Sequence, residues 1–295
     1  MDLRELIDGF AKREGIITGV CDAGQILKYK TKVNDAPFIK TCTGLNDPGA
    51  ALPGCKSIIA AGLGRRGRPA FSDDGAERGV FSNEATGTDY HVLIKNKLTE
   101  LKDYLLKFVR FNYKIYADTG PLNEKSLMIE AGLGWPGKNA LICSEEYGSF
   151  FNAGYILTDL NIASDNNILT PLCGECSRCV DACPGGALGE DGFDYRRCAS
   201  YLTQKKGPLN GGEQKIIGPN LYGCDICRDV CPFNTDVYTH DIDDIEDARP
   251  DLNKLLAMTT NEYDLRFKNN ALYWRGLGVL KRNAAYALNY IRGRS

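Results

Sequence analysis

Two runs of cysteine in the second half of the chain constrain its fold more than any other feature. The first run has the spacing C-x2-C-x2-C-x3-C-P and consists of Cys173, Cys176, Cys179 and Cys183, followed by Pro184. The second run consists of Cys224, Cys227 and Cys231, followed by Pro232, and Cys198 lies alone between the two runs. In sequences with the first spacing, the fourth cysteine binds the other cluster of a pair of iron–sulfur clusters. The pattern therefore predicts two clusters rather than one.

If the last cysteine of each run crosses over, the thiols divide into two sets of equal size. The first cluster takes Cys173, Cys176, Cys179 and Cys231. The second takes Cys183, Cys224 and Cys227, and Cys198 is the available candidate for its fourth ligand. Because no cysteine of these runs is left over, we interpret the region as a ferredoxin-like domain with two [4Fe-4S] clusters.

Two other uses of cysteine fit the pattern less well. Zinc sites usually show two well-separated C-x2-4-C pairs, which a tight triple and two Cys-Pro endings do not resemble. Disulfides are disfavoured because no apolar signal-peptide core follows Met1, which indicates a reducing, cytoplasmic compartment. The remaining thiols have apolar or small neighbours and are interpreted as buried or incidental residues; they are Cys21, Cys42, Cys55 and Cys143.

The composition is that of a soluble globular protein, with 43% hydrophobic and 25% charged residues. No apolar stretch approaches the ~18 residues that a membrane span requires. There is no Walker loop and no G-x-G-x-x-G after a strand, so nucleotide binding is not supported. The net charge of -2 gives no general attraction to nucleic acid, but no acidic residue follows Arg266. This basic tail either contacts phosphates or forms a solvated helix face.

Hydrophobic periodicity predicts alternating strands and helices in the first half of the chain, which is typical of an α/β (α+β) domain. Helices are expected from Leu3 to about Gly15, from Ile94 to Phe108 and between Pro121 and Gly132. Strands are expected at residues 15–21, 57–63, 113–117 and 149–158, with the last paired with residues 140–143. Residues 28–53 are expected to be mostly loop. A helix or helical pair is expected from Trp274 to Ile291, and the predicted domains are 1–165, 166–240 and 241–295.

Several short motifs together resemble the epoxyqueuosine reductase family. In the cysteine-rich region they are Arg197-Cys198-Ala199-Ser200-Tyr201-Leu202-Thr203 and Leu221-Tyr222-Gly223-Cys224-Asp225. In the preceding domain they are Gly87-Thr88-Asp89-Tyr90-His91, Ala117-Asp118-Thr119-Gly120-Pro121 and residues 132–139, which read GLGWPGKN. The likeness runs in the family's order from about Ser57 to the end, and the chain resembles a short member without most of the C-terminal helical-repeat domain.

The resemblance implies a specific activity. Members of the family bind cobalamin base-off in an N-terminal α/β domain related to corrinoid-dependent reductive dehalogenases. Two [4Fe-4S] clusters pass electrons to the cobalt, and the enzyme reduces the epoxide of epoxyqueuosine in the tRNA anticodon to give queuosine. The implied partners are tRNA and an external low-potential electron donor such as ferredoxin or flavodoxin, with no membrane.

The resemblance also assigns roles to residues. Asp118 is implied as the proton donor at the cofactor, with Asp89, Tyr90 and His91 as neighbouring catalytic residues. Opening an epoxide leaves an alkoxide-like oxygen, which a carboxylic acid can protonate if burial raises its pKa. A simple turn or helix-capping role for Asp118 remains open. Residues implied to line the corrin are Ser82, Asn139, Ile142, Ala153, Gly154 and Ile156, and Ser200 is implied near the second cluster and the cofactor.

Two departures keep other functions open. The family commonly carries Arg-Tyr after the serine, whereas here Asn83 and Glu84 follow Ser82. The shortened C-terminal region and the changed residues after Ser82 therefore leave the substrate less well defined than the cofactors. The first alternative is a corrinoid-dependent reductase of a small organic molecule, of reductive-dehalogenase character. The second is a non-catalytic electron-transfer protein that serves a corrinoid partner.

Overall fold

The computed structural model describes residues 2–25, 47–65, 75–165, 167–235, 237 and 247–293. The chain divides into two compact units, each assembled from separate stretches of sequence. Unit 1 takes its described residues from Met1–Arg65, His91–Cys176 and Pro232–His240. Unit 2 takes them from Arg66–Tyr90, Ser177–Cys231 and Asp241–Ser295. Each unit is described by itself below.

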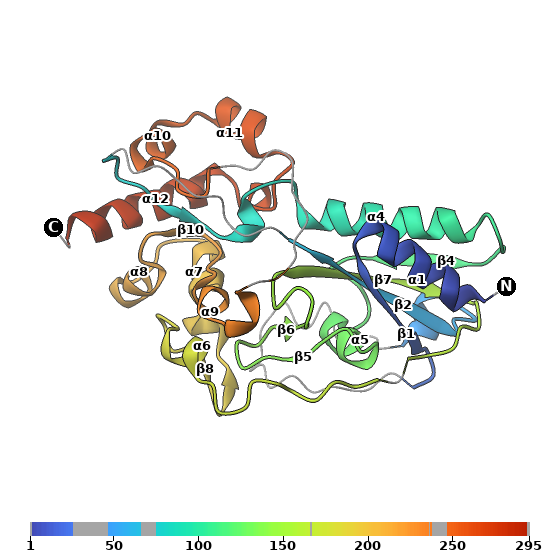
Figure 1. The fold of residues 1–295 in the computed structure, drawn as a ribbon. Helices are drawn as coiled ribbons and strands as arrows, with labels where there is room; N and C mark the ends of the chain where they lie inside the picture. Colours follow the sequence, from blue (N-terminus) through green and yellow to red (C-terminus); the bar gives the residue numbers. More distant parts are fainter. Residues whose placement is uncertain are drawn as a thin grey trace. The chain divides into compact units, whose positions relative to one another are not determined.

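A four-stranded sheet in the order β1-β2-β7-β4 forms the centre of unit 1 (Figure 1). The strands are β1 (Ile17–Asp22), β2 (Ser57–Gly64), β7 (Phe151–Thr158) and β4 (Tyr113–Tyr116). Every neighbouring pair is antiparallel. All residues of β2 are buried, as expected for a central strand whose two faces are both covered.

Helices cover both faces of this sheet (Figure 1). On one face, α1 (Leu3–Glu14) and α4 (Tyr90–Leu105) bury apolar side chains against Ile59, Ala61 and Ile156. On the other face, α5 (Glu124–Glu130) packs Leu127 against the strands. The shorter elements of unit 1 are α3 (Pro48–Ala51), β5 (Trp135–Pro136), β6 (Ile142–Cys143) and η3 (Pro232–Asn234). Because successive side chains of a strand point to opposite faces, alternate residues pack in the core beneath α1 and α4 or in the core beneath α5.

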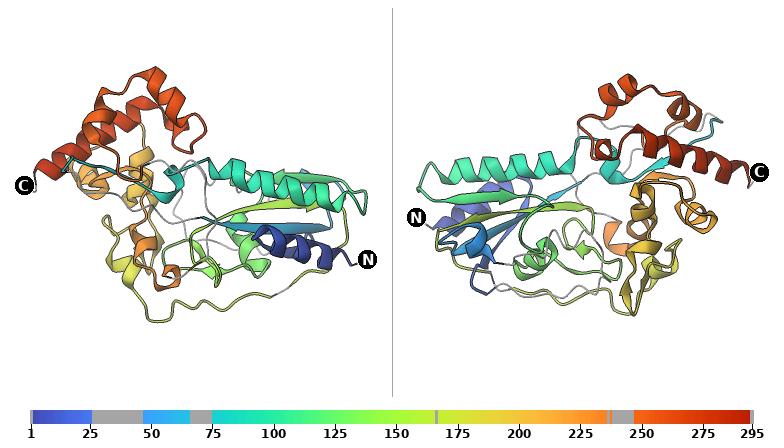
Figure 2. Two further views of the ribbon diagram at one scale, coloured as in Figure 1. Left: turned by 45° about the horizontal axis from the view of Figure 1, so that its top comes forward. Right: turned by 180° about the vertical axis from the view of Figure 1, so that it is seen from behind.

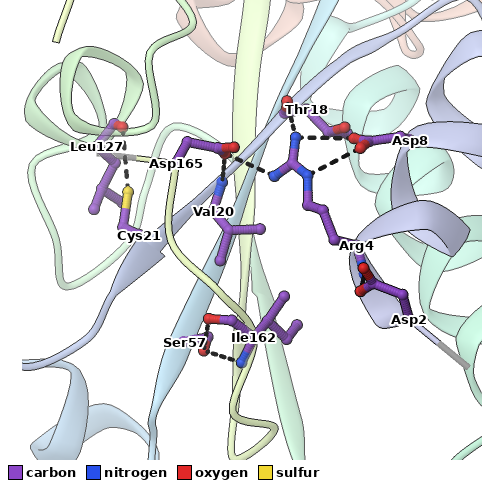
Figure 3. Close-up of polar contacts among 10 residues, drawn as sticks. All are labelled: Asp2, Arg4, Asp8, Thr18, Val20, Cys21, Ser57, Leu127, Ile162 and Asp165. Carbon is purple, nitrogen blue, oxygen red and sulfur yellow. Dashed lines mark hydrogen bonds and ion pairs between the residues drawn. The ribbon is translucent and has the colours of Figure 1, made fainter. Parts of the chain in front are cut away.

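One carboxylate fixes the chain after β7 to the N-terminal end of the unit (Figure 3). Asp165 Oδ2 accepts hydrogen bonds of 2.6 Å from the Val20 N–H and from Arg4 Nη1. The Asp165 N–H donates in turn to the Val20 carbonyl at 3.0 Å. Ser57 Oγ accepts from the Ile162 N–H at 3.0 Å, so the segment is held at a second point (Figure 3).

Unit 2 combines the cysteine-rich segment with the C-terminal helices. Its strands are β3 (Val80–Phe81), β8 (Leu188–Gly189), β9 (Gly192–Phe193) and β10 (Asn220–Tyr222), and its 3-10 helices are η1 (Asn83–Ala85), η2 (Tyr195–Arg197) and η4 (Tyr273–Arg275). Its α-helices are α6 (Arg178–Asp181), α7 (Ala199–Gln204), α8 (Gly211–Ile217), α9 (Ile226–Asp229), α10 (Leu252–Ala257), α11 (Thr260–Phe267) and α12 (Leu277–Arg292). Figure 2 shows α10 and α11 grouped with α12. Together these helices enclose a core that contains Phe81, Leu221 and Phe267.

The mixed helix-and-strand class expected from the sequence is confirmed, but one pairing was wrong. Residues 149–158 were expected to pair with 140–143, whereas β7 pairs with β2 and β4, and β6 pairs with β5. The sheet is antiparallel, so rules for the carboxyl edge of a parallel sheet do not apply to it. Much of the expected loop at 28–53 lies outside the described residues. The predicted three-domain division stays a prediction, and in the structure residues 75–90 belong with unit 2.

Asn283 on α12 generates a prediction about the stability of unit 2. Its side chain is fully buried, and Nδ2 donates hydrogen bonds of 2.7 Å to the carbonyls of Thr203 and Leu221. Replacing Asn283 by leucine leaves these buried acceptors with fewer donors and should cost about 2–3 kcal/mol. Thermal unfolding of the cluster-loaded protein under anaerobic conditions should show a melting temperature several degrees lower. The matched control is Asn289→Ala on the exposed side of the same helix, and equal melting temperatures for the two variants would contradict the prediction.

Candidate functional site

The loop after β4 places Asp118 beside His91. Asp118 lies two residues beyond the end of the strand and adopts a left-handed backbone conformation with a φ of 58°. His91 is in the first turn of α4, and its Nε2 lies 3.2 Å from Asp118 Oδ2. The Asp118 side chain is 52% exposed, so the carboxyl group faces solvent rather than a closed pocket. Two of the predicted catalytic residues are therefore brought together within unit 1.

The first turn of α5 supports this loop through a hydrogen bond to its backbone. Asn123 caps the helix by accepting a hydrogen bond from the Ser126 N–H at 3.1 Å. The next residue, Glu124, accepts a hydrogen bond from the Asp118 N–H at 3.1 Å. Burial, followed by the negative charge of Asp118, raises the pKa of Glu124 to about 8. A neutral carboxyl group thus supports the backbone of the predicted proton donor at neutral pH.

Lys125 supports the backbone of a second turn, at Ala140, as Glu124 supports the backbone at Asp118. Its Nζ donates a hydrogen bond of 2.6 Å to the carbonyl of Ala140, and burial lowers the pKa of the Lys125 ammonium group. Within the described ranges, Ala140 (φ of 63°) and Asp118 are the two non-glycine residues with a positive φ. Such conformations are costly for residues with a Cβ atom and persist where the surroundings impose them. Adjacent side chains of α5 therefore anchor both strained turns.

Asn139 lies in the second of these turns and is almost fully buried. Its Oδ1 accepts from the Leu141 N–H at 3.1 Å, and its Nδ2 donates to Ser149 Oγ at 3.5 Å. The Ser149 N–H donates to Asn234 Oδ1 at 2.7 Å, which ties the turn to the residues after the second cysteine run. A Cβ atom on Gly148 would lie 1.9 Å from Asn234 Oδ1, so only glycine permits this approach. The 137–141 turn is consequently rigid.

The other predicted corrin-lining residues of unit 1 do not share one face. Ala153 and Ile142 pack on the α5 side of the sheet, close to Tyr155 and Leu157. Ile156 is fully buried on the opposite side. A Cβ atom on Gly154 would also point there, 2.8 Å from Leu98 of α4. The side chains of these residues therefore lie on two different faces of the sheet.

Unit 2 brings four of the predicted cluster ligands together. Burial raises the pKa of the Cys198 thiol, and the nearby Cys183 raises it further. Burial also raises the pKa of Cys224 to about 12, with added effects from Cys198, Asp225 and Cys183. The pKa of Cys227 is raised by burial and by Cys224 and Cys198. Because these electrostatic effects act only at short range, the four thiols form one cluster of side chains.

Backbone N–H groups point at three of these sulfurs. The Ala187 N–H donates to Cys183 Sγ at 3.2 Å. Backbone groups of Tyr201 and Ser200, in the first turn of α7, hydrogen-bond the Cys198 thiol and oppose the increase in its pKa. Ile226 at the start of α9 does the same for Cys224. Hydrogen bonds of this kind stabilise thiolates and tune the potentials of iron–sulfur clusters. Ser200 thus lies beside the second ligand set, as the sequence implied.

The two cysteine runs fold in equivalent ways. In α6, the N–H groups of Val180 and Asp181 both donate to the Ser177 carbonyl. In α9, the N–H groups of Arg228 and Asp229 both donate to the Asp225 carbonyl. Each short helix contains a cysteine and is followed by a Cys-Pro pair. The repeat recognised in the spacing is therefore also a repeat in structure.

The four cysteines predicted to bind the first cluster are divided between the two units. Cys173 and Cys176 belong to unit 1, where Lys138 Nζ donates to the Gly174 carbonyl between them at 2.6 Å. Cys179 and Cys231 belong to unit 2. Among the described residues, no group of three or more His, Cys, Asp or Glu side chains is arranged to hold a single metal ion. The assignment of these thiols to one cluster stays a prediction.

The segment before α4 joins the second cysteine run through buried charges. Arg228 is buried and its Nη1 lies 3.0 Å from Glu84 Oε1 and 3.3 Å from Asp225 Oδ1. The Asn83 N–H donates to Asp225 Oδ2 at 2.5 Å. Asn83 and Glu84, which depart from the family's usual sequence, thus complete an ionic network around the helix that carries Cys227. Sequence reasoning missed this network because its members are 144 positions apart.

Ser82 lies at the start of the same segment. It is 3% exposed, and in the described part of the chain its Oγ has no hydrogen-bond partner. A Cβ atom on Gly223 would lie 2.1 Å from this oxygen. A buried hydroxyl group without a partner is costly, and a bound ligand would remove that cost. Asp89 and Tyr90 follow in the same unit, where the Asp89 N–H donates to the Asn269 carbonyl at 2.8 Å.

Known proteins match both regions of the chain. A family model described as "4Fe-4S double cluster binding domain" matches residues 172–234, and one described as "Epoxyqueuosine reductase QueG, DUF1730" matches residues 46–119. An epoxyqueuosine reductase of Lactococcus garvieae is 38% identical over 256 residues, which cover 84% of this chain and 73% of the relative.

Solved structures are similar over nearly the whole chain. That of epoxyqueuosine reductase from Streptococcus thermophilus has a TM-score of 0.86 and 32% identity, covering 99% of this chain and 82% of that one. A crystal structure of epoxyqueuosine reductase with a tRNA-Tyr epoxyqueuosine-modified tRNA stem loop has a TM-score of 0.88 and 31% identity, covering 98% and 82%.

The raised pKa of Glu124 generates a prediction about pH. A carboxyl group with a folded-state pKa near 8 stabilises the fold fully below about pH 4.5, and this contribution is lost as the pH rises toward 8. Glu124→Gln stays neutral, so its stability relative to the wild type should increase by about 1–3 kcal/mol between pH 5 and pH 8. Melting temperatures measured across this range test the trend. Glu146→Gln, at an exposed position of the same unit, is the control, and parallel curves for wild type and Glu124→Gln would refute the prediction.

Proposed function

The chain belongs to the epoxyqueuosine reductase family, and we propose that it reduces the epoxide of epoxyqueuosine in tRNA to the alkene of queuosine. The overall change takes up two electrons and two protons and releases the epoxide oxygen as water. Two [4Fe-4S] clusters carry the electrons, and cobalamin is the cofactor at which the substrate is reduced. An external low-potential donor such as ferredoxin or flavodoxin supplies the electrons.

The observation that carries this proposal is the position of the two family matches. The reductase model spans residues 46–119, which include Ser82, Asp89, His91 and Asp118. The cluster-binding model spans residues 172–234, which include every cysteine assigned to a cluster. The residues proposed for catalysis and for electron transfer therefore both lie within segments that match the family models. The tRNA substrate is proposed from the relative that was crystallised with a modified tRNA stem loop.

The residues of unit 2 suit an iron–sulfur cluster. Burial and neighbouring thiols raise the pKa of Cys198, Cys224 and Cys227, so these sulfurs require a positively charged core to ionise together. The N–H groups that point at Cys183, Cys198 and Cys224 suit thiolate sulfur. We assign Cys183, Cys198, Cys224 and Cys227 to one cluster, and Cys173, Cys176, Cys179 and Cys231 to the other.

Polar groups in both units suit cobalamin. The buried Ser82 hydroxyl group has no hydrogen-bond partner among the described residues. The turn at Asn139 presents backbone and amide groups. We propose Asn139, Ile142 and Ala153 of unit 1 as corrin contacts, and Ser82 of unit 2 as a separate candidate contact. Bound cobalamin supplies a low-valent cobalt centre that attacks or reduces electrophilic carbon. Gly154 and Ile156 are assigned to support of the sheet, because their side-chain positions face α4.

Asp118 and His91 are proposed to transfer protons to the substrate oxygen. The Asp118 carboxyl group is accessible, so a substrate oxygen can approach it, and burial beneath a bound substrate would favour the protonated form that donates from Oδ2. His91 Nε2 lies 3.2 Å from Asp118 Oδ2 and is placed to return a proton to that carboxylate oxygen. Glu124 holds the Asp118 backbone, which keeps the carboxyl group in one orientation. Asp89 and Tyr90 are proposed as further catalytic residues.

The described helices include none that is long and apolar enough to cross a lipid bilayer. We propose a cytoplasmic location, where tRNA and reduced ferredoxin or flavodoxin are both available.

Cys198 generates a prediction about cofactor content, because it is the one proposed ligand outside the two runs. Anaerobically reconstituted wild type should contain about eight iron atoms per chain, and Cys198→Ala should fall toward about four. Iron and sulfide analysis together with EPR of the reduced protein would measure the loss. Cys55→Ala removes a half-buried thiol outside the cluster region and should leave the content unchanged. Retention of both intact clusters in Cys198→Ala would require another fourth ligand.

Asp118 generates a prediction about catalysis. Asp118→Asn retains the size of the side chain and its backbone position but cannot donate a carboxyl proton. Queuosine formation from epoxyqueuosine-containing RNA should slow by about 10²- to 10⁴-fold, with both clusters and cobalamin still bound. Asp103→Asn, at an exposed carboxyl group of α4, should keep wild-type activity. An unchanged rate in Asp118→Asn would remove Asp118 from the mechanism, and absence of turnover in the wild type would favour an electron-transfer role.

A further inference from the structure

Trp274 is an unusual exposed residue in unit 2. It is 61% exposed, although a tryptophan side chain gains more than most from burial. The chain contains two tryptophans, and the other, Trp135, is fully buried. An exposed indole ring held in a fixed orientation is a typical feature of a recognition surface.

The orientation of the Trp274 ring is fixed from two sides. Its Nε1 donates a hydrogen bond of 2.8 Å to the hydroxyl group of Tyr222, which itself donates to the Ala271 carbonyl at 2.9 Å. The guanidinium group of Arg275 lies over the ring, 3.4 Å from its centroid. With one face covered by a cation and the edge bonded to Tyr222, the opposite face of the ring remains for a ligand.

The same turn is bonded to residues that the proposed reaction uses. Asn270 Nδ2 donates to the carbonyls of Ala85 and Gly87 at 2.9 and 2.8 Å. The Asn269 carbonyl accepts from the Asp89 N–H. On the other side, Tyr222 is two residues from Cys224. Trp274 therefore lies between the segment that leads to His91 and the second cluster-binding run.

The charge around this turn suits a polyanion. Arg266 and Lys268 are exposed just before it and Arg275 is within it, while the carboxylate of Asp264 accepts a hydrogen bond of 3.1 Å from the Tyr273 hydroxyl group. An aromatic platform flanked by cations is how proteins hold unpaired bases, because the ring stacks on the base and the cations approach the phosphates. A small organic substrate would need neither the exposed ring nor the exposed cations.

We propose that the open face of Trp274 is a stacking platform for an unpaired base of the RNA substrate. This inference rests on the proposed action on tRNA. It assigns to Trp274 the recognition of the anticodon loop as single-stranded RNA, while Arg266 and Lys268 contact the backbone.

The test compares Trp274→Ala with Trp274→Phe, which retains an aromatic ring. The probe is an anticodon stem-loop RNA of tRNA-Tyr, and the control RNA has the same stem closed by a tight tetraloop. With the cluster-loaded protein, Trp274→Ala should weaken stem-loop binding about 5- to 150-fold, whereas Trp274→Phe should stay within about threefold of wild type. The loss should be similar at 50 and 200 mM salt, because stacking releases few counterions. Binding of the control RNA should not change.

A second measurement reports on the ring directly. In a Trp135→Phe background the remaining fluorescence arises from Trp274, and the stem-loop RNA should quench it and protect it from acrylamide. Equal stem-loop affinities of wild type and Trp274→Ala, or undiminished access of acrylamide, would overturn the stacking role. If wild type still forms queuosine in that case, the proposed function stands and only this inference fails. If wild type neither binds the stem loop nor reduces epoxyqueuosine-containing RNA, both fail.

Discussion

The burial of four thiols in one place is the constraint on which unit 2 depends. Cys183, Cys198, Cys224 and Cys227 come from three separate stretches of sequence, and partial burial together with neighbouring sulfurs raises the pKa of the last three. Such a group is stable only when a cationic core binds it or when its protons remain in place. Ala187, the first turn of α7 and the start of α9 supply N–H groups toward three of these sulfurs. The helices of the C-terminal segment matter because they hold α7 and β10, and with them the cysteines, at the necessary positions.

Unit 1 depends on a different principle, which is support of strained backbone. Asp118 and Ala140 adopt conformations that their side chains disfavour, and α5 holds the first by a carboxyl group and the second by an ammonium group. Both supporting groups are shifted toward their neutral forms by burial. The loop that carries Asp118 can therefore remain exposed to solvent while its backbone stays fixed, because Glu124 and Lys125 hold it from α5.

Sequence reasoning identified the features that depend on local spacing. The cysteine runs, the end of α1 before Gly15, and the proximity of His91 and Asp118 implied by the family resemblance all agree with the structure. It failed where partners are distant in sequence. The apolar run of β7 contains no signal for its partner strands, so its pairing with β2 and β4 was missed. Glu124 and Lys125 read as ordinary helix-start residues, and Arg228 reads as a surface charge. Their roles follow from tertiary contacts that periodicity does not encode.

The return of the chain between the two units has a consequence for biosynthesis. Residues 77–81 form part of unit 2, where Gly79 bonds to Pro250, β3 pairs with β10, and Glu77 forms an ion pair with Arg292, 215 residues later. At translation rates of about 5–20 residues per second, this early segment waits roughly 10–40 seconds for its last partner to leave the ribosome. During that interval the cysteine-rich region emerges before the helices that complete its core. Cluster delivery in the cell is therefore expected to follow synthesis of the helices that complete this core, and chaperones or cluster carriers have a defined interval in which to protect the nascent thiols.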